Sequence, residues 1–309
     1  MYPAGESVLK VVAYFDLFDY PVTLEEIKFF LDQPFAEEQL FEELRKLVKA
    51  NMLYWLNGFY SLRADYQLAE RRLQGNRAAA KALKRASKIA GFLTWFPYIR
   101  GVAVSGSLSK KFAYKGSDID FFIITERNRL WTARLVFLSF WYVARLVGLK
   151  RWFCLNYYID TGAAEIPEKN IYTAIEIATL IPKRGKNCLA DFYRQNEWVY
   201  NYLPNYKPSV ETIKDNRRGI LAVLIEWLLN NSAGNALEKF ICNFFHKRWK
   251  RMLAENRYAK NGFHLGSYIA EAHVCKPMPH YFQSKLLKRL DEKMKELDKK
   301  LIILQKADV

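Results

Sequence analysis

Two short apolar runs on either side of a polar loop constrain the fold of this chain more than any other stretch. They lie in residues 102–125, "VAVSGSLSKKFAYKGSDIDFFIIT". The first run ends in Ser105-Gly106-Ser107, and the second follows directly on Asp118-Ile119-Asp120. Short apolar runs bounded by glycine and polar residues are typical of buried strands. The chain therefore places two carboxylates at the start of one buried strand, near a Gly-Ser turn that ends another.

The two aspartates indicate a site for a divalent cation. Residues two apart in a strand point to the same face, so we expect the carboxylates of Asp118 and Asp120 to lie together. Carboxylates that close repel each other unless a cation lies between them. Mg²⁺ suits such a site, because it prefers oxygen ligands and keeps waters and phosphates as its other ligands. Asp118 and Asp120 therefore indicate a Mg²⁺ site.

The Gly-Ser turn indicates a phosphate site beside this metal. The backbone N–H groups of Gly106 and Ser107 can hold a phosphate, with the Ser107 hydroxyl as a further ligand and glycine allowing close approach. Lys110 and Lys111, together with Lys115, add positive charge on the same loop. We predict that Gly106, Ser107, Lys110 and Lys111 bind a nucleoside triphosphate. A triphosphate held beside a metal describes phosphoryl-type transfer.

This pattern resembles a known family. Gly-Ser, ten residues and then Asp-x-Asp within "GSDID" is similar to the signature of the DNA polymerase beta-like nucleotidyltransferase superfamily, especially its minimal and antibiotic-modifying branches. The likeness covers about residues 100–165. The resemblance implies that Gly106 and Ser107 bind the nucleotide phosphates and that Asp118 and Asp120 hold one or two Mg²⁺ ions. It also implies transfer of a nucleoside monophosphate from an NTP to an acceptor hydroxyl, with release of pyrophosphate. The acceptor, a small molecule, an RNA end or a protein side chain, is left open.

The third carboxylate of that family pattern is where this sequence departs from it. A right-handed crossover after the aspartate strand makes "RWFCLNYYID", residues 151–160, a parallel neighbour. We expect Asn156 to lie level with the aspartates, and an asparagine carries no charge and takes no proton. The side chain of Asp160 is expected on the same strand face as that of Asn156, but about 13 Å further along. A shifted register is therefore needed to bring Asp160 level with the aspartates. Two functions follow: an active nucleotidyltransferase, or a catalytically degenerate nucleotide-binding sensor or scaffold.

The N-terminal residues resemble a winged helix. Two helices within residues 7–31, a third over about 36–51 and a hairpin at Asn57-Gly58 follow in that order. The third helix begins with "AEEQLFEEL", whose carboxylates repel phosphates. We therefore favour protein contact or packing for this domain over DNA binding. Alternatively, the acidic domain lies against the basic remainder of its own chain.

Charge is distributed unevenly. The chain has a net charge of +16, yet residues 1–63 hold six Lys/Arg and ten Asp/Glu. Residues 64–115 hold eleven basic and two acidic residues. This favours a polyanionic partner for residues 64–115, either nucleotide phosphates or nucleic acid; a solvated basic surface is the alternative. Seven of the basic residues fall on one predicted helix: Arg71, Arg72, Arg77, Lys81, Lys84, Arg85 and Lys88.

The expected fold class is α+β or α/β, with a nucleotidyltransferase-type mixed sheet and flanking helices. A strand over 118–125, a helix over 129–147 and the strand over 151–160 form a βαβ unit. From about residue 170 onward the chain reads as helical. We expect a winged-helix-like domain over 1–63, a nucleotidyltransferase-type domain over 64–185 and a helical region over 186–309. The last helix carries a short apolar seam that we expect to dock on the protein's own core: Leu287, Leu290, Met294, Leu297, Leu301 and Leu304.

Location and the remaining motifs carry weaker indications. The first residues lack the pattern of a signal peptide, and the longest apolar run, between Arg134 and Arg145, is too short to cross a bilayer. We expect a cytoplasmic protein with no membrane partner. The four cysteines are far apart and predicted to be free thiols. His273, Cys275 and His280 lie close in sequence, but we interpret their segment as a packed loop rather than a zinc site.

Overall fold

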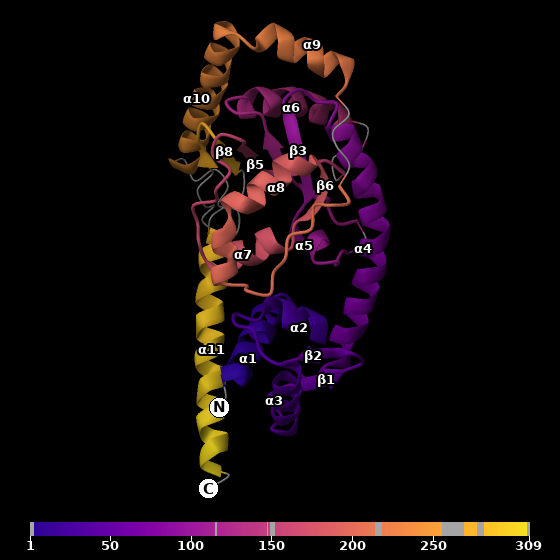
Figure 1. The fold of residues 1–309 in the computed structure, drawn as a ribbon, viewed down its shortest axis with the longest axis vertical. Coiled ribbons are helices and arrows are strands. Elements are labelled where there is room, and N and C mark those ends of the chain that lie inside the picture. The colour runs from indigo at the N-terminus through magenta and orange to yellow at the C-terminus, as the bar shows by residue number, and fades with distance from the viewer. Residues whose placement is uncertain are drawn as a thin grey trace.

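The computed structural model describes residues 3–114, 116–146, 148, 152–213, 218–254, 269–276 and 281–307, without the side chains of residues 3, 156, 253, 254, 281 and 303–307. A mixed sheet with helices on both faces occupies one end of the molecule (Figure 1). A smaller unit, built from the first residues of the chain, lies at the other end, close to the C-terminal helix.

The N-terminal unit has the predicted order of three helices and a hairpin. Its elements are α1 (Pro3–Asp16), α2 (Leu24–Phe30), α3 (Glu37–Lys49), β1 (Tyr54–Leu56) and β2 (Phe59–Ser61). Thr23 caps α2 in a capping box with Glu26, which satisfies N–H groups at the helix start. Asn57 and Gly58 both adopt positive φ, as a tight hairpin turn requires.

The main sheet has the strand order β6-β3-β4-β5-β8-β7. Its strands are β3 (Ile99–Val104), β4 (Asp120–Thr125), β5 (Cys154–Asp160), β6 (Ile181–Arg184), β7 (Ile269–Ala270) and β8 (Val274–Lys276). Strands β4 and β5 are parallel and are joined by α6 (Leu130–Leu146), so the predicted βαβ unit is confirmed. The other neighbours pair antiparallel. The result is an α+β architecture with a mixed sheet.

Alternation along the central strands divides the apolar core between the two faces of the sheet. Phe122 and Ile124 pack toward α7 (Ile171–Ala178), α8 (Lys186–Gln195) and the short 3-10 helix η2 (Glu197–Asn201). Phe121 and Ile123 pack toward α4 (Tyr66–Leu93), α6 and α10 (Ser232–Ala254). Because successive strand residues point to opposite faces, one apolar run serves both layers.

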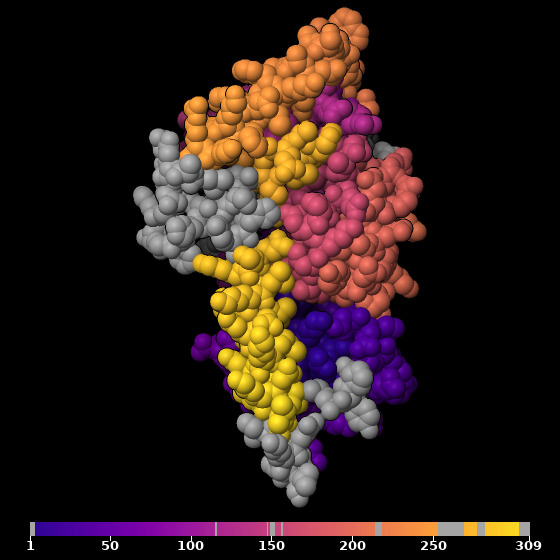
Figure 2. Space-filling model, turned by 90° about the vertical axis from the view of Figure 1, so that its left-hand side faces the viewer, coloured from indigo at the N-terminus to yellow at the C-terminus, as the bar shows by residue number. Residues whose placement is uncertain are grey.

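Two long helices connect the two ends of the molecule. Helix α4 runs from the β1–β2 hairpin to the sheet (Figure 1). Helix α11 (Tyr281–Ala307) lies beside the N-terminal residues, where its yellow atoms meet indigo ones (Figure 2). Leu286, Leu290 and Leu297 are buried on it, with Met294 and Leu301 partly buried. The predicted docking of the seam on the protein's own core is confirmed for Leu290, Met294, Leu297 and Leu301, whereas Leu286 rather than the predicted Leu287 is the buried residue at its start.

Ion pairs tie the acidic N-terminal unit to basic residues that follow it in the chain. Glu26 lies 2.6 Å from Arg72, and Asp19 lies 3.3 Å from Arg71. Asp16 pairs with Lys293 of α11. Packing of an acidic unit on a basic remainder, one of the two alternatives from the charge pattern, is thus observed, although the carboxylates involved come from α1, α2 and the turn between them rather than from α3.

Two expectations about elements are corrected. The chain after residue 170 is not helical throughout, because β6, β7 and β8 add three strands to the sheet. These strands have two to four residues, too few for a period to show in sequence, and β6 contains Pro182. The aspartate strand begins at Asp120 rather than Asp118.

Two observations bear on compartment. No helix within the described residues is long and apolar enough to span a bilayer. All four cysteines are free, as predicted.

Candidate active site

The Gly-Ser turn lies at the end of β3, against the first residue of β4. The Ser105 N–H donates to the Asp120 carbonyl oxygen at 2.9 Å, which ties the turn to the start of the aspartate strand. Gly106 then opens the one-turn helix α5 (Gly106–Ser109) with φ +68°. The strand, the turn and the next strand thus bring Gly106 and Asp120 together across a loop of thirteen residues, 107–119.

Gly106 is needed for a steric reason as well. A Cβ at this position would lie 2.5 Å from Asp120 Oδ2, well inside contact distance. Only glycine therefore allows the backbone of the turn to sit directly against this carboxylate. The close approach places any group held by the turn beside an acidic oxygen.

The structure separates the two predicted metal ligands. Asp120 is half-buried and lines a pocket, whereas Asp118 is exposed in the loop before β4 and does not line it. The expectation that both carboxylates share a strand face rested on a strand starting at Asp118, and β4 starts two residues later. Asp120 is consequently the carboxylate that the fold holds at the pocket.

Lys110 and Lys111 also part. Lys110 lines the pocket, and its Nζ lies 2.8 Å from Glu176 Oε1 and 3.3 Å from the Gly106 carbonyl oxygen. Lys111 is exposed, in the left-handed region with φ +57°, and lies outside the pocket lining. Of the predicted phosphate-binding residues, the structure therefore brings Gly106, Ser107 and Lys110 together at one pocket.

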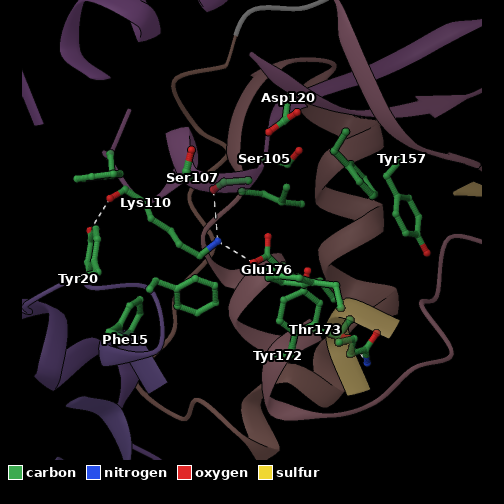
Figure 3. Close-up of a pocket in the computed structure, with 18 of the residues that line it drawn as sticks. Phe15, Tyr20, Ser105, Ser107, Lys110, Asp120, Tyr157, Tyr172, Thr173 and Glu176 are labelled. Carbon is green, nitrogen blue, oxygen red and sulfur yellow. Dashed lines mark hydrogen bonds and ion pairs between the residues drawn. The ribbon is translucent and has the colours of Figure 1, made fainter. Parts of the chain in front are cut away.

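The pocket has a volume of about 600 Å³ and is lined by residues that lie far apart in the chain. Asp120 and Ser105 lie at one end, and Phe15 and Tyr172 at the other (Figure 3). The wall opposite the Gly-Ser turn is aromatic and comes from the N-terminal unit, α7 and α11: Phe15, Phe18, Tyr20, Tyr172 and Phe282. The Tyr20 hydroxyl donates to the Lys110 carbonyl oxygen at 2.5 Å, so this wall is bonded to the turn itself.

Burial sets the protonation of the polar groups in the pocket wall. It raises the pKa of Tyr157 and Tyr172 well above the ordinary range, so both hydroxyls stay protonated. Burial lowers the pKa of Lys276, which also lines the pocket. The place of these residues and of Glu176 in the pocket could not be predicted from the sequence, because they are far apart in the chain and belong to no motif.

The strand next to the aspartate strand carries a register shift near the predicted third ligand. Asp120 pairs with Cys154 and Phe121 with Leu155, but Phe122 pairs with Tyr157. Asn156 falls at this irregularity and has no Cα partner on β4, so the residue level with Asp120 is Cys154, not Asn156. The register shift turns Tyr157 toward the pocket. There its ring stacks on that of Phe122, with the two ring centres 5.4 Å apart.

Asp160 lies at the far end of β5 and is held by its own hydrogen bonds. It pairs with Thr125, is fully buried, and accepts from the N–H groups of Asn128 and Gly162, both at 2.8 Å. His273 Nδ1 lies 2.8 Å from Asp160 Oδ2, the oxygen that also accepts from Asn128. Asp160 does not line the pocket, because the shift on β5 is too small to carry it to the Asp120 end.

The described residues contain no group of three or more His, Cys, Asp or Glu side chains that could hold a metal ion. His273 contacts Asp160 and Cys275 is buried in β8, while His280 lies outside the described residues. The donors that fit Mg²⁺ are thus Asp120 and its near neighbour Asp118, with the remaining ligands left to phosphates and water.

Comparison with known proteins agrees with this geometry. Residues 86–176 match the family model of a nucleotidyltransferase domain. The matched stretch runs from the second half of α4 into α7 and includes the Gly-Ser turn, both aspartates and Lys110. It supports the nucleotidyltransferase superfamily for under a third of the chain. No curated protein and no solved structure matched the chain.

Proposed function

We propose that this protein is a Mg²⁺-dependent nucleotidyltransferase that moves a nucleoside monophosphate from an NTP to an acceptor hydroxyl. The observation that carries the proposal is the contact of Gly106 with Asp120 at the edge of a pocket. It lies inside the stretch that matches the nucleotidyltransferase domain. A phosphate-holding turn pressed against a carboxylate is the geometry that phosphoryl-type transfer needs.

Each residue has a chemical role in this proposal. The N–H groups of Gly106 and Ser107 and the Ser107 hydroxyl hold phosphate oxygens, and Lys110 adds positive charge. Asp120, assisted by Asp118, holds Mg²⁺, which when bound offsets the charge of the triphosphate. The acceptor oxygen attacks the α-phosphorus, the bond to pyrophosphate breaks, and the hydroxyl proton passes to Asp120, the pocket carboxylate beside the turn.

The pocket favours a small molecule as the acceptor. Its volume of about 600 Å³ lies within the usual range of small-molecule sites, about 300–1,000 Å³. Phe15, Phe18 and Phe282 line the side opposite the turn. Apolar rings on that side suit the apolar body of a small molecule better than the charged backbone of an RNA. We propose an acceptor with a hydroxyl group and an apolar body; replacing Phe282 with alanine should raise the KM for such an acceptor and leave the KM for the NTP unchanged.

A second candidate function is that of a catalytically degenerate nucleotide binder, acting as a sensor or scaffold. Cys154 and Asn156 stand where the family pattern carries its third carboxylate, and neither supplies one. In this version the N-terminal unit, winged-helix-like in element order, contacts a protein partner through the exposed carboxylates Glu38 and Glu42 of α3. The free cysteines support a cytoplasmic location for either candidate.

Nucleic acid remains a proposed partner of the basic region 64–115. Arg71 and Arg72 are engaged with the N-terminal unit, but four other side chains of α4 are exposed on one stripe: Arg77, Lys81, Lys84 and Lys88. Lys81→Glu/Lys84→Glu/Lys88→Glu should abolish binding of a labelled oligonucleotide at low salt. Equal affinity in this triple variant would remove nucleic acid from the list of partners.

Thermal shift with ATP, GTP, CTP and UTP, each with and without Mg²⁺, tests the nucleotide site. We expect stabilisation that needs Mg²⁺, a large loss in Asp120→Ala and a smaller loss in Asp118→Ala, because only Asp120 lines the pocket. Asp298→Ala, an exposed carboxylate on α11, is the matched control and should behave as wild type. The same stabilisation in an Asp118→Ala/Asp120→Ala variant would rule out the proposed site.

Release of pyrophosphate separates the two candidate functions. An enzyme should release it from the bound NTP at a slow basal rate, with water as acceptor, and Asp120→Ala should abolish that release. A protein that binds an NTP with Mg²⁺ and releases none, at any pH between about 6 and 9, would favour the degenerate binder.

A further inference from the structure

Helix α9 (Ile220–Leu229), "ILAVLIEWLL", exposes its apolar residues and buries its charged residue, the reverse of an ordinary surface helix. Its charged residue, Glu226, is buried at 6% exposure, whereas Ile220 is 91% exposed and Trp227 is 74% exposed. A helix on the surface of a soluble protein places its apolar stripe on the core and its polar residues outside. Here the apolar stripe faces outward, which calls for a partner on that side.

Buried hydrogen bonds hold the helix in this orientation. Glu226 Oε1 accepts from the Tyr98 N–H at 2.6 Å, and Arg100 donates to both carboxylate oxygens at 3.0 and 2.9 Å. Tyr98 and Arg100 belong to the start of the main sheet, so the contact fixes the rotation of α9 about its axis. The hydrogen bonds of Glu226 therefore explain why the apolar residues of α9 face outward.

The outward residues form one continuous face. They recur three and four apart along the helix, the spacing of a single helical stripe. The face consists of Ile220, Leu221, Val223, Leu224, Trp227 and Leu228. It lies at the end of the molecule remote from the C-terminus (Figures 1 and 2).

The exposed charge on α10, the helix that follows α9, has one sign. Within α9 and α10 the sequence holds two carboxylates, Glu226 and Glu238, and both are buried. Glu238 accepts from the N–H groups of Trp131 and Thr132. Five basic side chains of α10 are exposed, Lys239 near its start and Lys247, Arg248, Lys250 and Arg251 toward its end. An apolar helix followed by a helix that exposes Lys and Arg but no acid is the pattern of a segment that lies on an anionic bilayer.

We propose that α9 seats on the surface of an anionic lipid bilayer, with the basic residues of α10 beside the headgroups. Ten residues are too few to cross the hydrocarbon core, so the helix lies in the plane of the interface. A second copy of this chain fits less well, because it would bring the same basic side chains together with no exposed carboxylate of α9 or α10 to pair with them. The proposal revises the expectation of no membrane partner, which rested on the absence of a spanning run.

Co-sedimentation of the full chain with vesicles tests the proposal. Vesicles of phosphatidylcholine alone are compared with vesicles containing about one third phosphatidylglycerol. We expect wild type to bind the anionic vesicles, and Leu221→Glu/Leu224→Glu/Trp227→Glu to weaken binding by at least about tenfold. These three side chains are exposed, so the fold should survive their replacement. Trp55→Glu/Tyr66→Glu/Leu73→Glu, equally exposed residues near the other end of the molecule, should bind as wild type.

Two triple charge-reversal variants test the contribution of the basic residues of α10 to vesicle binding. Lys247→Glu/Arg248→Glu/Arg251→Glu should reduce anionic-vesicle binding by at least about tenfold, while the charge-matched Lys288→Glu/Lys299→Glu/Lys300→Glu on α11 should not. Wild type that stays in the supernatant, or an α9 variant that binds as wild type does, overturns the proposal. Sedimentation velocity without vesicles should show a monomer; a dimer that the α9 substitutions dissociate would assign the face to a second copy instead.

Discussion

At the scale of single residues, Gly106 decides more than either aspartate. Its left-handed backbone turns the chain at the end of β3, and the missing Cβ leaves room for the Asp120 carboxylate. Both the left-handed backbone and the close approach of Asp120 depend on the absence of a Cβ at this position. In the proposed function, a carboxylate displaced from this turn would no longer hold the metal beside the nucleotide phosphates.

We predict that Gly106→Ala abolishes Mg²⁺-dependent stabilisation by nucleotides while the protein still folds. The methyl group would lie 2.5 Å from Asp120 Oδ2 and push that carboxylate aside. Left-handed backbone adds about 1–2 kcal/mol of destabilisation. Thermal shift with and without nucleotide measures both effects.

Gly148→Ala separates strain from steric displacement. Gly148 has a similar positive φ of +77°, but a Cβ there would meet nothing within 4 Å. This control should lose comparable stability and keep its full response to nucleotide. Equal loss of the response in both variants would show that strain alone, rather than contact with Asp120, is responsible.

At the scale of elements, α9 is positioned by one carboxylate rather than by apolar packing. Burial would raise the pKa of Glu226, but hydrogen bonds from Arg100 and the Tyr98 N–H outweigh it and hold that pKa below its ordinary value. A lowered pKa in the folded state means that the ionised carboxylate stabilises the fold. That stabilisation is complete above the ordinary glutamate pKa and is lost as the pH falls through the lowered one.

We predict that Glu226→Gln lowers the free energy of unfolding by about 2–3 kcal/mol at neutral pH, because it leaves Arg100 with one of its two carboxylate partners. The difference from wild type should shrink as the pH falls below about 4.5, the ordinary glutamate pKa. Urea denaturation over a pH series measures it. Asp191→Asn, in an exposed ion pair with Arg194, should show little effect at any pH. A constant difference across the series would contradict the role of the ionised carboxylate.

At the scale of the whole molecule, the pocket exists because distant segments close around it. The N-terminal unit is fastened by Arg72, whose guanidinium lies 2.6 Å from Glu26, 2.8 Å from the Pro21 carbonyl oxygen and 3.6 Å from the centre of the Tyr20 ring. Tyr20 in turn contacts Lys110 at the Gly-Ser turn. The buried Arg72 side chain, through Tyr20, therefore connects the aromatic wall to the Gly-Ser turn.

We predict that Arg72→Met destabilises the protein by about 3 kcal/mol, since it removes the partner of a partly buried carboxylate. Nucleotide binding should weaken too, because Tyr20 loses its support. Arg77→Met, an exposed arginine one turn further along α4, is the control and should leave both quantities unchanged. Urea denaturation and thermal shift measure them, and a fully stable Arg72→Met protein would show that the Arg72–Glu26 ion pair is not needed to hold the N-terminal unit.

Much of the fold follows from local pattern. The strands on either side of the Gly-Ser turn, the βαβ connection, the hairpin at Asn57-Gly58 and the seam of α11 each occupy contiguous residues with a clear period or turn residue. The short strands β6, β7 and β8 could not be predicted, because two to four residues show no period and pairing partners come from elsewhere in the chain. Register was equally hidden, since the shift at Asn156 depends on how β5 packs against β4.

Sixteen consecutive residues, 105–120, contain the groups that are available for chemistry: a Gly-Ser turn, a carboxylate pair and a lysine. Those groups lie close in the chain, so local geometry was enough to bring most of them together. Three features come instead from long-range packing: Asp120 rather than Asp118 reaches the pocket, three aromatic side chains from residues 15–20 form its far wall, and α9 turns its apolar face outward. Each of these depends on contacts between residues far apart in sequence, whose energies no local pattern contains.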